Sequence, residues 1–411
     1  MDLILLKRLP LLVIACSFGL TACSDNDSND NTSSTVTPQP RTIAVSNYSA
    51  TNSTAVSAVS QKINYRMPSV NGSETIATAV VFVPKGTAPA GGWPIVAWAH
   101  GTTGVADVCA PSNSTDLGGV DPIIAQLVAQ GYMVVAPDYE GLGSAGIHPY
   151  LNLASEARSI VYAVLAAREN VSSAGTRWLA YGHSQGGHAA LGAAQYANEA
   201  TGLSYLGTVA IAPASNLGLA IGGGTQLAGQ LLQAGDITSA IGVIAQQITF
   251  SAYVTAGLKQ TTTVSYSDVF DAQAAAIVHQ VEQRCDVGNL IGADIGNHAQ
   301  TTGNPLTYQG LKANFASVPA VANFLSTQSE PATVKLNQPV LIIQGDADTT
   351  VPKPLTDKLV ADMKRLGSSV NYQILNGATH TTAFTAEASL QQVATFISQR
   401  FNPTAVPVSA Q

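Results

Sequence analysis

Charge is scarce in this sequence of 411 residues. Asp, Glu, Lys and Arg together make up 10 % of it, whereas a globular protein ordinarily holds about a quarter. The Lys and Arg residues form no run after residue 8 and the formal net charge is −7, so no nucleic-acid partner is expected. The low charge also leaves little material for the ion-pair networks of hyperthermophilic proteins. Hydrophobic residues make up 46 %, which is enough for a sizeable core.

The N-terminus is typical of a targeting segment. Lys7 and Arg8 precede an apolar stretch, residues 9–20, that is too short to span a membrane. The sequence Leu-Thr-Ala-Cys at residues 20–23 resembles a bacterial lipobox. Residues 1–22 are therefore predicted to be a lipoprotein signal peptide, and Cys23 the lipidated residue that anchors the protein to a membrane. An ordinary secretory signal is the alternative.

The residues after Cys23 bear on location. Ser24 follows the cysteine, which implies sorting to the bacterial outer membrane, facing the periplasm or the cell surface. Residues 23–42 are mostly Ser, Asn, Asp, Thr and Pro, and cannot bury a core. We expect a flexible tether that lets an exported domain, residues 43–411, stand off the membrane.

Cysteine is also scarce, with four residues in all. No C-x-x-C or H-E-x-x-H motif occurs, so the sequence predicts no redox dithiol, no metal site and no cofactor. Cys109 and Cys285 remain in the exported domain, where a disulfide between them is expected. Two buried free thiols are the alternative.

Short apolar runs alternate with helical patterns from about residue 60 onward. This alternation predicts an α/β fold with a mostly parallel, doubly wound sheet, whose first two strands form an antiparallel edge. The predicted strands are Lys62–Met67, Glu74–Val83, Pro94–Ala99, Tyr132–Pro137, Arg177–Tyr181, Leu206–Ala212, Pro339–Gln344 and Val370–Leu375. The predicted helices are Pro122–Gln130, Ser155–Glu169, His188–Glu199, Pro354–Leu366 and Ala386–Phe401.

One stretch, about residues 214–330, breaks this rhythm. It is rich in Gly, Ala, Gln and Leu and holds no clear strand–helix pair. A structureless loop of this length is uncommon in a compact domain. The stretch is predicted to be a helical cap inserted over the sheet, with an independent second domain as the alternative.

Residues 182–186 read Gly-His-Ser-Gln-Gly, a match to G-x-S-x-G. They lie between a predicted strand and a predicted helix, which is the setting of a nucleophile elbow. Small residues are needed there because the serine takes a strained backbone conformation and the turn touches its neighbours. Ser184 is thus the candidate nucleophile; a glycine-rich turn with an idle serine is the alternative.

A serine needs a base, and the base needs an orienting carboxylate. Asp346 and Asp348 both follow a late strand; Asp348 fits the G-x-x-D-x-x-V-P loop of such enzymes, and Asp346 is expected to brace the turn. His380 lies in the predicted loop before the last helix. The order Ser184, Asp348, His380 is the chain order expected of this fold.

An oxyanion hole requires two backbone N–H groups. One is expected from Gln185, after the nucleophile, and the other from Thr102 in the loop that follows the third predicted strand, with Thr103 as the alternative. Three histidines near these residues are expected to brace or pack rather than to act as bases; they are His100, His183 and His188.

Taken together, the loop at residues 100–104, the elbow, the Asp348 loop and His380 resemble the secretory lipase family of α/β-hydrolases, which includes fungal lipase A and bacterial relatives. The residues 137–141, Pro-Asp-Tyr-Glu-Gly, add to the resemblance. It implies a monomeric serine carboxylic-ester hydrolase acting on an ester or acyl-lipid substrate. A disulfide between Cys109 and Cys285 would then tie the cap to the core and limit its opening. The alternatives are a peptidase or amidase on the same fold, a polyester-degrading hydrolase, and a non-catalytic binding lipoprotein.

Overall fold

A computed structural model describes residues 39–402 of the chain. The predicted signal peptide and the predicted lipidation site, Cys23, lie outside the described residues. The first strand begins at Thr42, where the expected tether ends.

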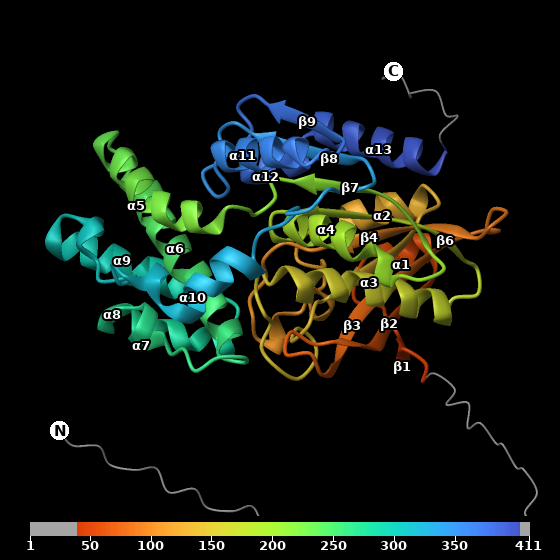
Figure 1. The fold of residues 1–411 in the computed structure, drawn as a ribbon, viewed down its shortest axis with the longest axis horizontal. Coiled ribbons are helices and arrows are strands. Elements are labelled where there is room, and N and C mark those ends of the chain that lie inside the picture. The colour runs from red at the N-terminus through yellow and green to blue at the C-terminus, as the bar shows by residue number, and fades with distance from the viewer. Residues whose placement is uncertain (1–38, 403–411) are drawn as a thin grey trace, which may run out of the picture. The chain divides into compact units, whose positions relative to one another are not determined.

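A nine-stranded sheet forms the centre of the fold, in the order β1-β2-β3-β5-β4-β6-β7-β8-β9 (Figure 1). The pairs between β1, β2, β3 and β5 are antiparallel, and every pair from β5 to β9 is parallel. The strands are β1 (Thr42–Asn47), β2 (Ser57–Pro68), β3 (Glu74–Pro84), β4 (Trp93–Ala99), β5 (Met133–Pro137), β6 (Ala174–His183), β7 (Ser204–Ile211), β8 (Val340–Gly345) and β9 (Val370–Leu375).

The predicted antiparallel edge is present as β2 and β3. It carries one further strand, β1, that was not predicted from the sequence. Five of the six residues of β1 are exposed, so the strand has no buried face and its sequence shows no apolar period.

Central strands are buried on both faces, as a parallel sheet requires. Along β4, Ile95 and Ala97 pack on one side of the sheet, and Val96 and Trp98 pack on the other. One face is covered by α3, α4 and α11, and the opposite face by α1, α2, α12 and α13. These helices are α1 (Ser53–Val56), α2 (Asp121–Ala129), α3 (Leu153–Asn170), α4 (Gln185–Tyr196), α11 (Lys353–Arg365), α12 (His380–Thr385) and α13 (Glu387–Phe401).

All predicted strands and helices outside the insertion are found, with ends shifted by a few residues. The short helices α1 and α12 were not predicted, and neither were three single 3₁₀ turns in the connections between elements. The 3₁₀ turns are η1 (Asp107–Cys109), η2 (Pro111–Asn113) and η3 (Ala197–Glu199).

Between β7 and β8 the chain leaves the sheet and forms a group of helices, here called the cap, which lies at the left of Figure 1. The cap is built around an apolar cluster, mainly from α6, α8 and α9, which Val105, Tyr150 and Leu151 join from outside the cap. By length and composition α6 could cross a membrane, but half of its apolar window is buried in this core. The cap elements are α5 (Leu217–Gln233), α6 (Ile237–Leu258), α7 (Tyr266–Val269), α8 (Ala272–Val278), η4 (His279–Glu282), α9 (Val287–Thr302), η5 (Pro305–Thr307), η6 (Phe315–Ser317), α10 (Pro319–Asn323) and the π-helical turn η7 (Phe324–Gln328).

Candidate active site

Ser184 is the single residue between the end of β6 and the start of α4. Its backbone is strained, with φ 60° and ψ −122°. The flanking glycines are needed because backbones touch at this turn. A Cβ on Gly186 would lie 1.9 Å from the Ala99 carbonyl oxygen, and one on Gly182 would lie 2.2 Å from the Gly186 carbonyl oxygen. The turn therefore has the form of a nucleophile elbow, with its serine at the carboxyl end of the sheet.

Asp348 and His380 come together from the loops after β8 and β9. The Nδ1 atom of His380 lies 2.7 Å from Oδ2 of Asp348. The other oxygen of Asp348 accepts the backbone N–H groups of Thr350 and Val351 at 2.9 and 2.8 Å. Asp346 does not take this place: its Oδ1 accepts the N–H of Gly377 at 2.6 Å and so joins the two loops.

Gln344, at the end of β8, is a functional candidate that was not predicted from the sequence. Its side chain is fully buried, and its Nε2 donates to Oδ2 of Asp348 at 3.1 Å and to the Val351 carbonyl at 3.0 Å. Its Oε1 accepts from the Thr356 hydroxyl at 2.7 Å. Gln344 thus holds one oxygen of the Asp348 carboxylate and two backbone N–H groups hold the other, in addition to the contact with the His380 ring.

His380 is not in a loop, as the sequence suggested, but is the first residue of α12. The helix starts there because Thr379 and Thr382 form a reciprocal capping box. His183 lies beside it, with ring centroids 4.5 Å apart, and its Nε2 donates to the His380 carbonyl at 3.0 Å. Burial, with the nearby His380, lowers the pKa of His183 to about 3, so this neighbouring ring is neutral.

The hydrogen bonds among residues 39–402 include none between the Ser184 hydroxyl and the His380 ring. Both residues nevertheless line the same cavity. Such a bond is commonly long without substrate and shortens in the reacting complex.

The loop after β4 faces the elbow. A Cβ on Gly101 would lie 4.0 Å from Cβ of Ser184, and Thr102 and Thr103 line the cavity that contains Ser184. His100 is buried against Tyr139 and its Nε2 lies 3.1 Å from the Asp138 carbonyl, so its ring ties this loop to the one after β5. The Thr102 hydroxyl lies 2.8 Å from the Tyr150 hydroxyl.

A buried polar network lies behind the elbow and was not foreseen. Its centre is Glu156 on α3, which accepts from Gln185 Nε2 at 2.8 Å, from His188 Nδ1 at 2.6 Å and from the Leu151 N–H at 3.0 Å. Although burial raises the pKa of Glu156, His188 and His148 beside it bring that pKa down to about 2. The carboxylate is therefore charged, and it fixes the side chain of the residue next to the nucleophile.

His188 connects this network to the cap. Its Nε2 lies 2.9 Å from the carbonyl of Ser329, where the chain returns from the cap. Both ring nitrogens of His188 face oxygen acceptors, so a doubly protonated ring satisfies both, as an ion pair with Glu156. Next along the chain, Glu330 accepts the N–H groups of Asn216 and Leu217 at 2.9 and 3.2 Å. The two ends of the cap are thus joined to each other.

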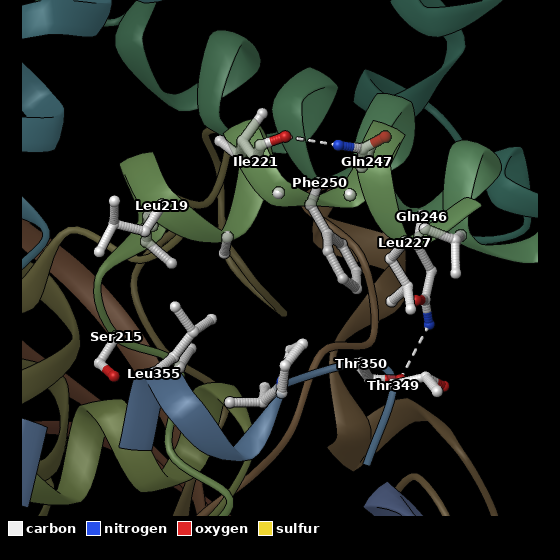
Figure 2. A pocket seen from close by; sticks show the side chains of 18 of the residues that line it. Ser215, Leu219, Ile221, Leu227, Gln246, Gln247, Phe250, Thr349, Thr350 and Leu355 are labelled. Atoms are coloured by element: carbon white, nitrogen blue, oxygen red, sulfur yellow. Dashed lines mark hydrogen bonds between the residues drawn. The ribbon is translucent and has the colours of Figure 1, made fainter. Parts of the chain in front are cut away.

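Two cavities meet at Ser184. The first, of about 480 Å³, lies between α5, α6 and the start of α11 and also reaches Asp348. Its wall is largely apolar; Figure 2 shows Phe250 pointing into it from α6, with Leu219, Leu227 and Leu355 around it. The Gln246 side chain also lines this cavity, and its Nε2 donates to the Thr350 hydroxyl at 3.2 Å.

The second cavity, of about 1070 Å³, lies on the side of His380 and the Thr102 loop. Many of its lining side chains are polar and uncharged; they are Thr102, Thr103, Ser239, Gln246, Thr249, Asn289, Thr349, Thr350, Thr381 and Thr385. Neither cavity is lined by a Lys, Arg or Glu side chain of residues 39–402. In the same described range no three His, Cys, Asp or Glu residues gather as metal ligands would.

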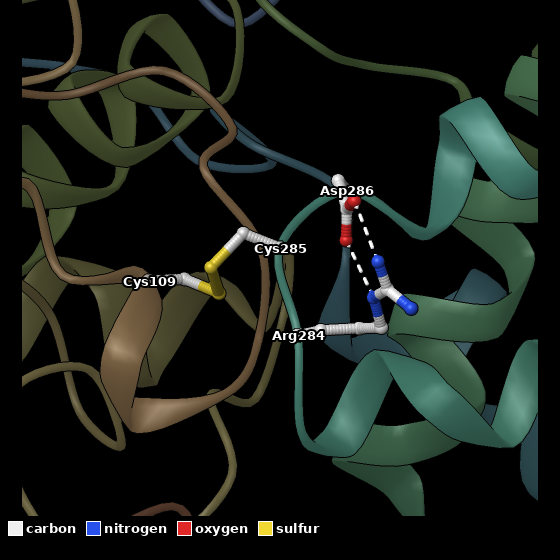
Figure 3. The surroundings of a disulfide bond; sticks show 4 residues. All are labelled: Cys109, Arg284, Cys285 and Asp286. Carbon is white, nitrogen blue, oxygen red and sulfur yellow. Dashed lines mark hydrogen bonds and ion pairs between the residues drawn. A yellow bond between two sulfur atoms is a disulfide. The ribbon is translucent and has the colours of Figure 1, made fainter.

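The expected disulfide joins Cys109, after the Thr102 loop, to Cys285 in the cap (Figure 3). The two Cα atoms are 5.6 Å apart and the residues are 176 positions apart in the chain. Beside the bond, Arg284 and Asp286 form an exposed ion pair, with Nε and Oδ1 2.6 Å apart. The cap is therefore covalently tied to the core within reach of the candidate site.

The chain resembles several known proteins. A family model described as secretory lipase matches residues 111–407. Among solved structures, a candidate hydrolase from Legionella pneumophila superposes with a TM-score of 0.68 at 18 % identity, covering 89 % of this chain and 100 % of that one. Candida antarctica lipase A in its closed state gives 0.65 at 19 % identity, covering 90 % of this chain and 83 % of that one. A search of curated proteins finds no match.

A third structure is similar to the same degree. A variant of LipA, the rice cell wall degrading esterase from Xanthomonas oryzae, gives a TM-score of 0.61 at 19 % identity, covering 88 % of this chain and 97 % of that one. At such low identities, these similarities are evidence for the fold alone. They confirm the predicted α/β-hydrolase fold, a mostly parallel sheet with flanking helices.

Proposed function

Because this chain belongs to the secretory lipase family and is a carboxylic ester hydrolase, we propose that Ser184, His380 and Asp348 form its catalytic triad and that hydrolysis passes through an acyl-enzyme. The observation that carries the proposal is the 2.7 Å contact between His380 and Asp348. His380 lines the larger cavity and Asp348 the smaller one, and the strained Ser184 lines both.

The roles follow from the chemistry of the groups. His380 takes the proton of the Ser184 hydroxyl through Nε2 as the oxygen attacks the ester carbonyl, and then gives that proton to the leaving alcohol. Asp348, which accepts from Nδ1, keeps the ring in the required tautomer and stabilises the imidazolium. A water molecule then attacks the acyl-enzyme with the same assistance, releasing the acid and restoring Ser184.

The negative oxygen of the tetrahedral intermediate requires donors that are fixed in advance. Gln185 is the first residue of α4, and its backbone N–H is the first proposed donor. The N–H of Thr102 is the second, since the neighbouring Gly101 approaches Ser184 closely. Thr103 remains the alternative for this second donor.

The two cavities support a division of the substrate. The apolar cavity beneath α5 and α6 suits the acyl chain, because it removes hydrocarbon from water. The larger cavity, with its threonine and amide side chains, suits the alcohol. Neither wall carries a cation for an anionic group, so a neutral ester is the proposed substrate.

Hydrolysis of p-nitrophenyl esters, from acetate to palmitate, tests the triad and the acyl cavity together. Ser184→Ala should lose nearly all turnover, by about 10⁶-fold, whereas Ser46→Ala on the exposed strand β1 should keep it. A fluorophosphonate probe should label wild-type protein and leave folded Ser184→Ala unlabelled. Full turnover in Ser184→Ala would contradict the proposal.

A parallel assay with aminoacyl-anilides separates an esterase from a peptidase or amidase. Ester turnover should exceed anilide turnover by orders of magnitude. A reversed preference would favour the peptidase alternative, and would leave the triad itself in place.

Membership of a secretory family suggests export, and the disulfide fits an extracellular protein. The finer proposal is an outer-membrane lipoprotein held through Cys23. It is supported by the lipobox-like residues 20–23 and by Ser24. Cys23→Ser should move the protein from the membrane fraction to the soluble fraction; retention in the membrane would contradict anchoring.

A further inference from the structure

Two hydroxyl groups meet at the edge of the proposed oxyanion hole. The oxygens of Thr102 and Tyr150 are 2.8 Å apart, although the residues lie on separate loops, after β4 and before α3. Each hydroxyl has one proton, and a single bond between them uses only one. The other proton is available to a third group.

Burial decides which proton is used. Tyr150 is only 3 % exposed, and its hydroxyl has no other hydrogen-bond partner among residues 39–402. A buried hydroxyl that does not donate is costly, so Tyr150 donates to Thr102. Thr102 is partly exposed to the cavity that holds Ser184, and its own proton is free to point there.

The Tyr150 ring is held in place by its neighbours. The ring meets Tyr253 edge-on at 5.3 Å between ring centroids and His148 edge-on at 6.2 Å. The backbone N–H of Tyr150 donates to the His148 carbonyl at 2.8 Å. Burial raises the pKa of Tyr150 well above its usual range, so the phenol stays protonated at working pH. A fixed donor of this kind orients Thr102 before substrate arrives.

We propose that the Thr102 hydroxyl is a third oxyanion donor, and that Tyr150 is the positioning residue that turns its proton toward the substrate. The inference rests on the proposed triad mechanism. As Ser184 attacks, the carbonyl π electrons move to oxygen and the serine proton moves to His380. The Thr102 hydroxyl donates a hydrogen bond to that oxygen and transfers no proton.

Thr102→Val removes the hydroxyl and keeps both the side-chain shape and the backbone N–H. Its kcat should fall by roughly 100-fold, the usual effect of losing one oxyanion donor, with KM little changed. Affinity for a trifluoromethyl ketone, which forms the tetrahedral adduct, should fall in parallel. Thr102→Ser keeps the hydroxyl. Its kcat should fall by less than the loss of one neutral hydrogen bond would cause, and so stay within about 5-fold of wild type.

Tyr150→Phe keeps the ring and should lower kcat by about 5-fold. In the Thr102→Val background it should have no further effect, because Tyr150 acts only through Thr102. Tyr205→Phe is the matched control and should keep wild-type kcat, because it breaks another buried pair of tyrosine and threonine hydroxyls, 2.7 Å from Thr208, that lines neither cavity.

Thermal unfolding of every variant shows whether it is folded. The proposal is overturned if folded Thr102→Val keeps its kcat, or if Tyr150→Phe is impaired more than Thr102→Val. An active Ser184→Ala would instead overturn the triad, so the two failures are distinguishable.

Discussion

Around Ser184 the core is held by touching backbones and buried hydrogen bonds, whereas α5, at the wall of the apolar cavity, packs on α6 largely through small apolar side chains. At the elbow there is no room for a Cβ on Gly182 or Gly186, and the polar groups behind it are fully buried. Within the cap, α5 packs on α6 through Ala228, Ala240 and Val243 and exposes 57 % of Leu219.

The difference matches what each region must do in the proposed mechanism. The triad and oxyanion hole need fixed geometry, which backbone contact provides. The acyl cavity must accept a flexible chain, and α5, with its small buried contact on α6, can yield to it. The two ends of the cap are joined by Glu330 and held to the core by the Ser329 carbonyl on His188, and its middle is held by the disulfide.

The largest contrast is expected between two glycine substitutions. Gly186→Ala puts a Cβ 1.9 Å from the fixed Ala99 carbonyl oxygen, and should cost more than about 4 kcal/mol or prevent folding. Gly224→Ala on α5 meets a side chain and no backbone: its Cβ would lie 2.2 Å from Nε2 and 2.8 Å from Cγ of Gln247, which must move and give up its hydrogen bond to the Ile221 carbonyl. We therefore expect Gly224→Ala to lower the urea unfolding midpoint far less than Gly186→Ala does. Equal losses in the two variants would remove the distinction between core and cap.

The buried pair of Glu156 and His188 should show the next largest effect. Glu156→Gln leaves the imidazolium of His188 without its counter-charge and should destabilise the fold by about 3–5 kcal/mol. Glu169→Gln, which breaks only the surface pair with Arg41, should cost less than about 1 kcal/mol. Urea unfolding of both variants at neutral pH measures the difference.

Acid should weaken the same pair. The pKa of Glu156 is about 2 in the fold against an ordinary 4.5, so the unfolded chain binds more protons between these values. Its contribution to stability is therefore complete above about pH 4.5 and is lost as the pH falls toward 2. His183, with a pKa of about 3 against an ordinary 6.5, also favours unfolding as the pH falls below 6.5. Unfolding free energies from pH 7 to 2 should decline, and less steeply below pH 4.5 in Glu156→Gln.

Removing the disulfide tests how firmly the cap is held to the core. Replacing Cys109 and Cys285 by Ala opens a link across 176 positions and should cost about 2–4 kcal/mol. Limited proteolysis should then cut within residues 217–328 before it cuts the sheet. If the cap is no more accessible to protease without the disulfide, the bond does not restrain it.

The smallest expected effect is a gain in stability. Gly222 lies within α5, and a Cβ added there meets nothing within 4 Å. Gly222→Ala should stabilise the helix by about 1 kcal/mol, seen as slower amide hydrogen exchange along α5 than in wild type. If hydrolysis of long-chain esters slows while that of acetate does not, α5 must move to admit the chain.

Much of the fold was predictable because its signals are local. The strand β4 is apolar throughout and β8 begins with four apolar residues, and turn residues follow both, which identifies buried parallel strands. The strand β1 gave no such signal because it is exposed, and the start of α12 at His380 depended on a threonine capping box. Within residues 214–330 apolar Ala and Gly are spread too evenly for helix ends to be assigned.

The sequence by itself predicted the order of the proposed nucleophile, acid and base, since each lies within a few residues after a strand whose pattern is readable. Only the tertiary structure decided which groups support them. Gln185 meets Glu156 across 29 positions, Thr102 meets Tyr150 across 48, and His188 meets Ser329 across 141. No local pattern encodes such pairs, because a buried polar side chain takes whichever partner the packed helices and loops bring within hydrogen-bond distance.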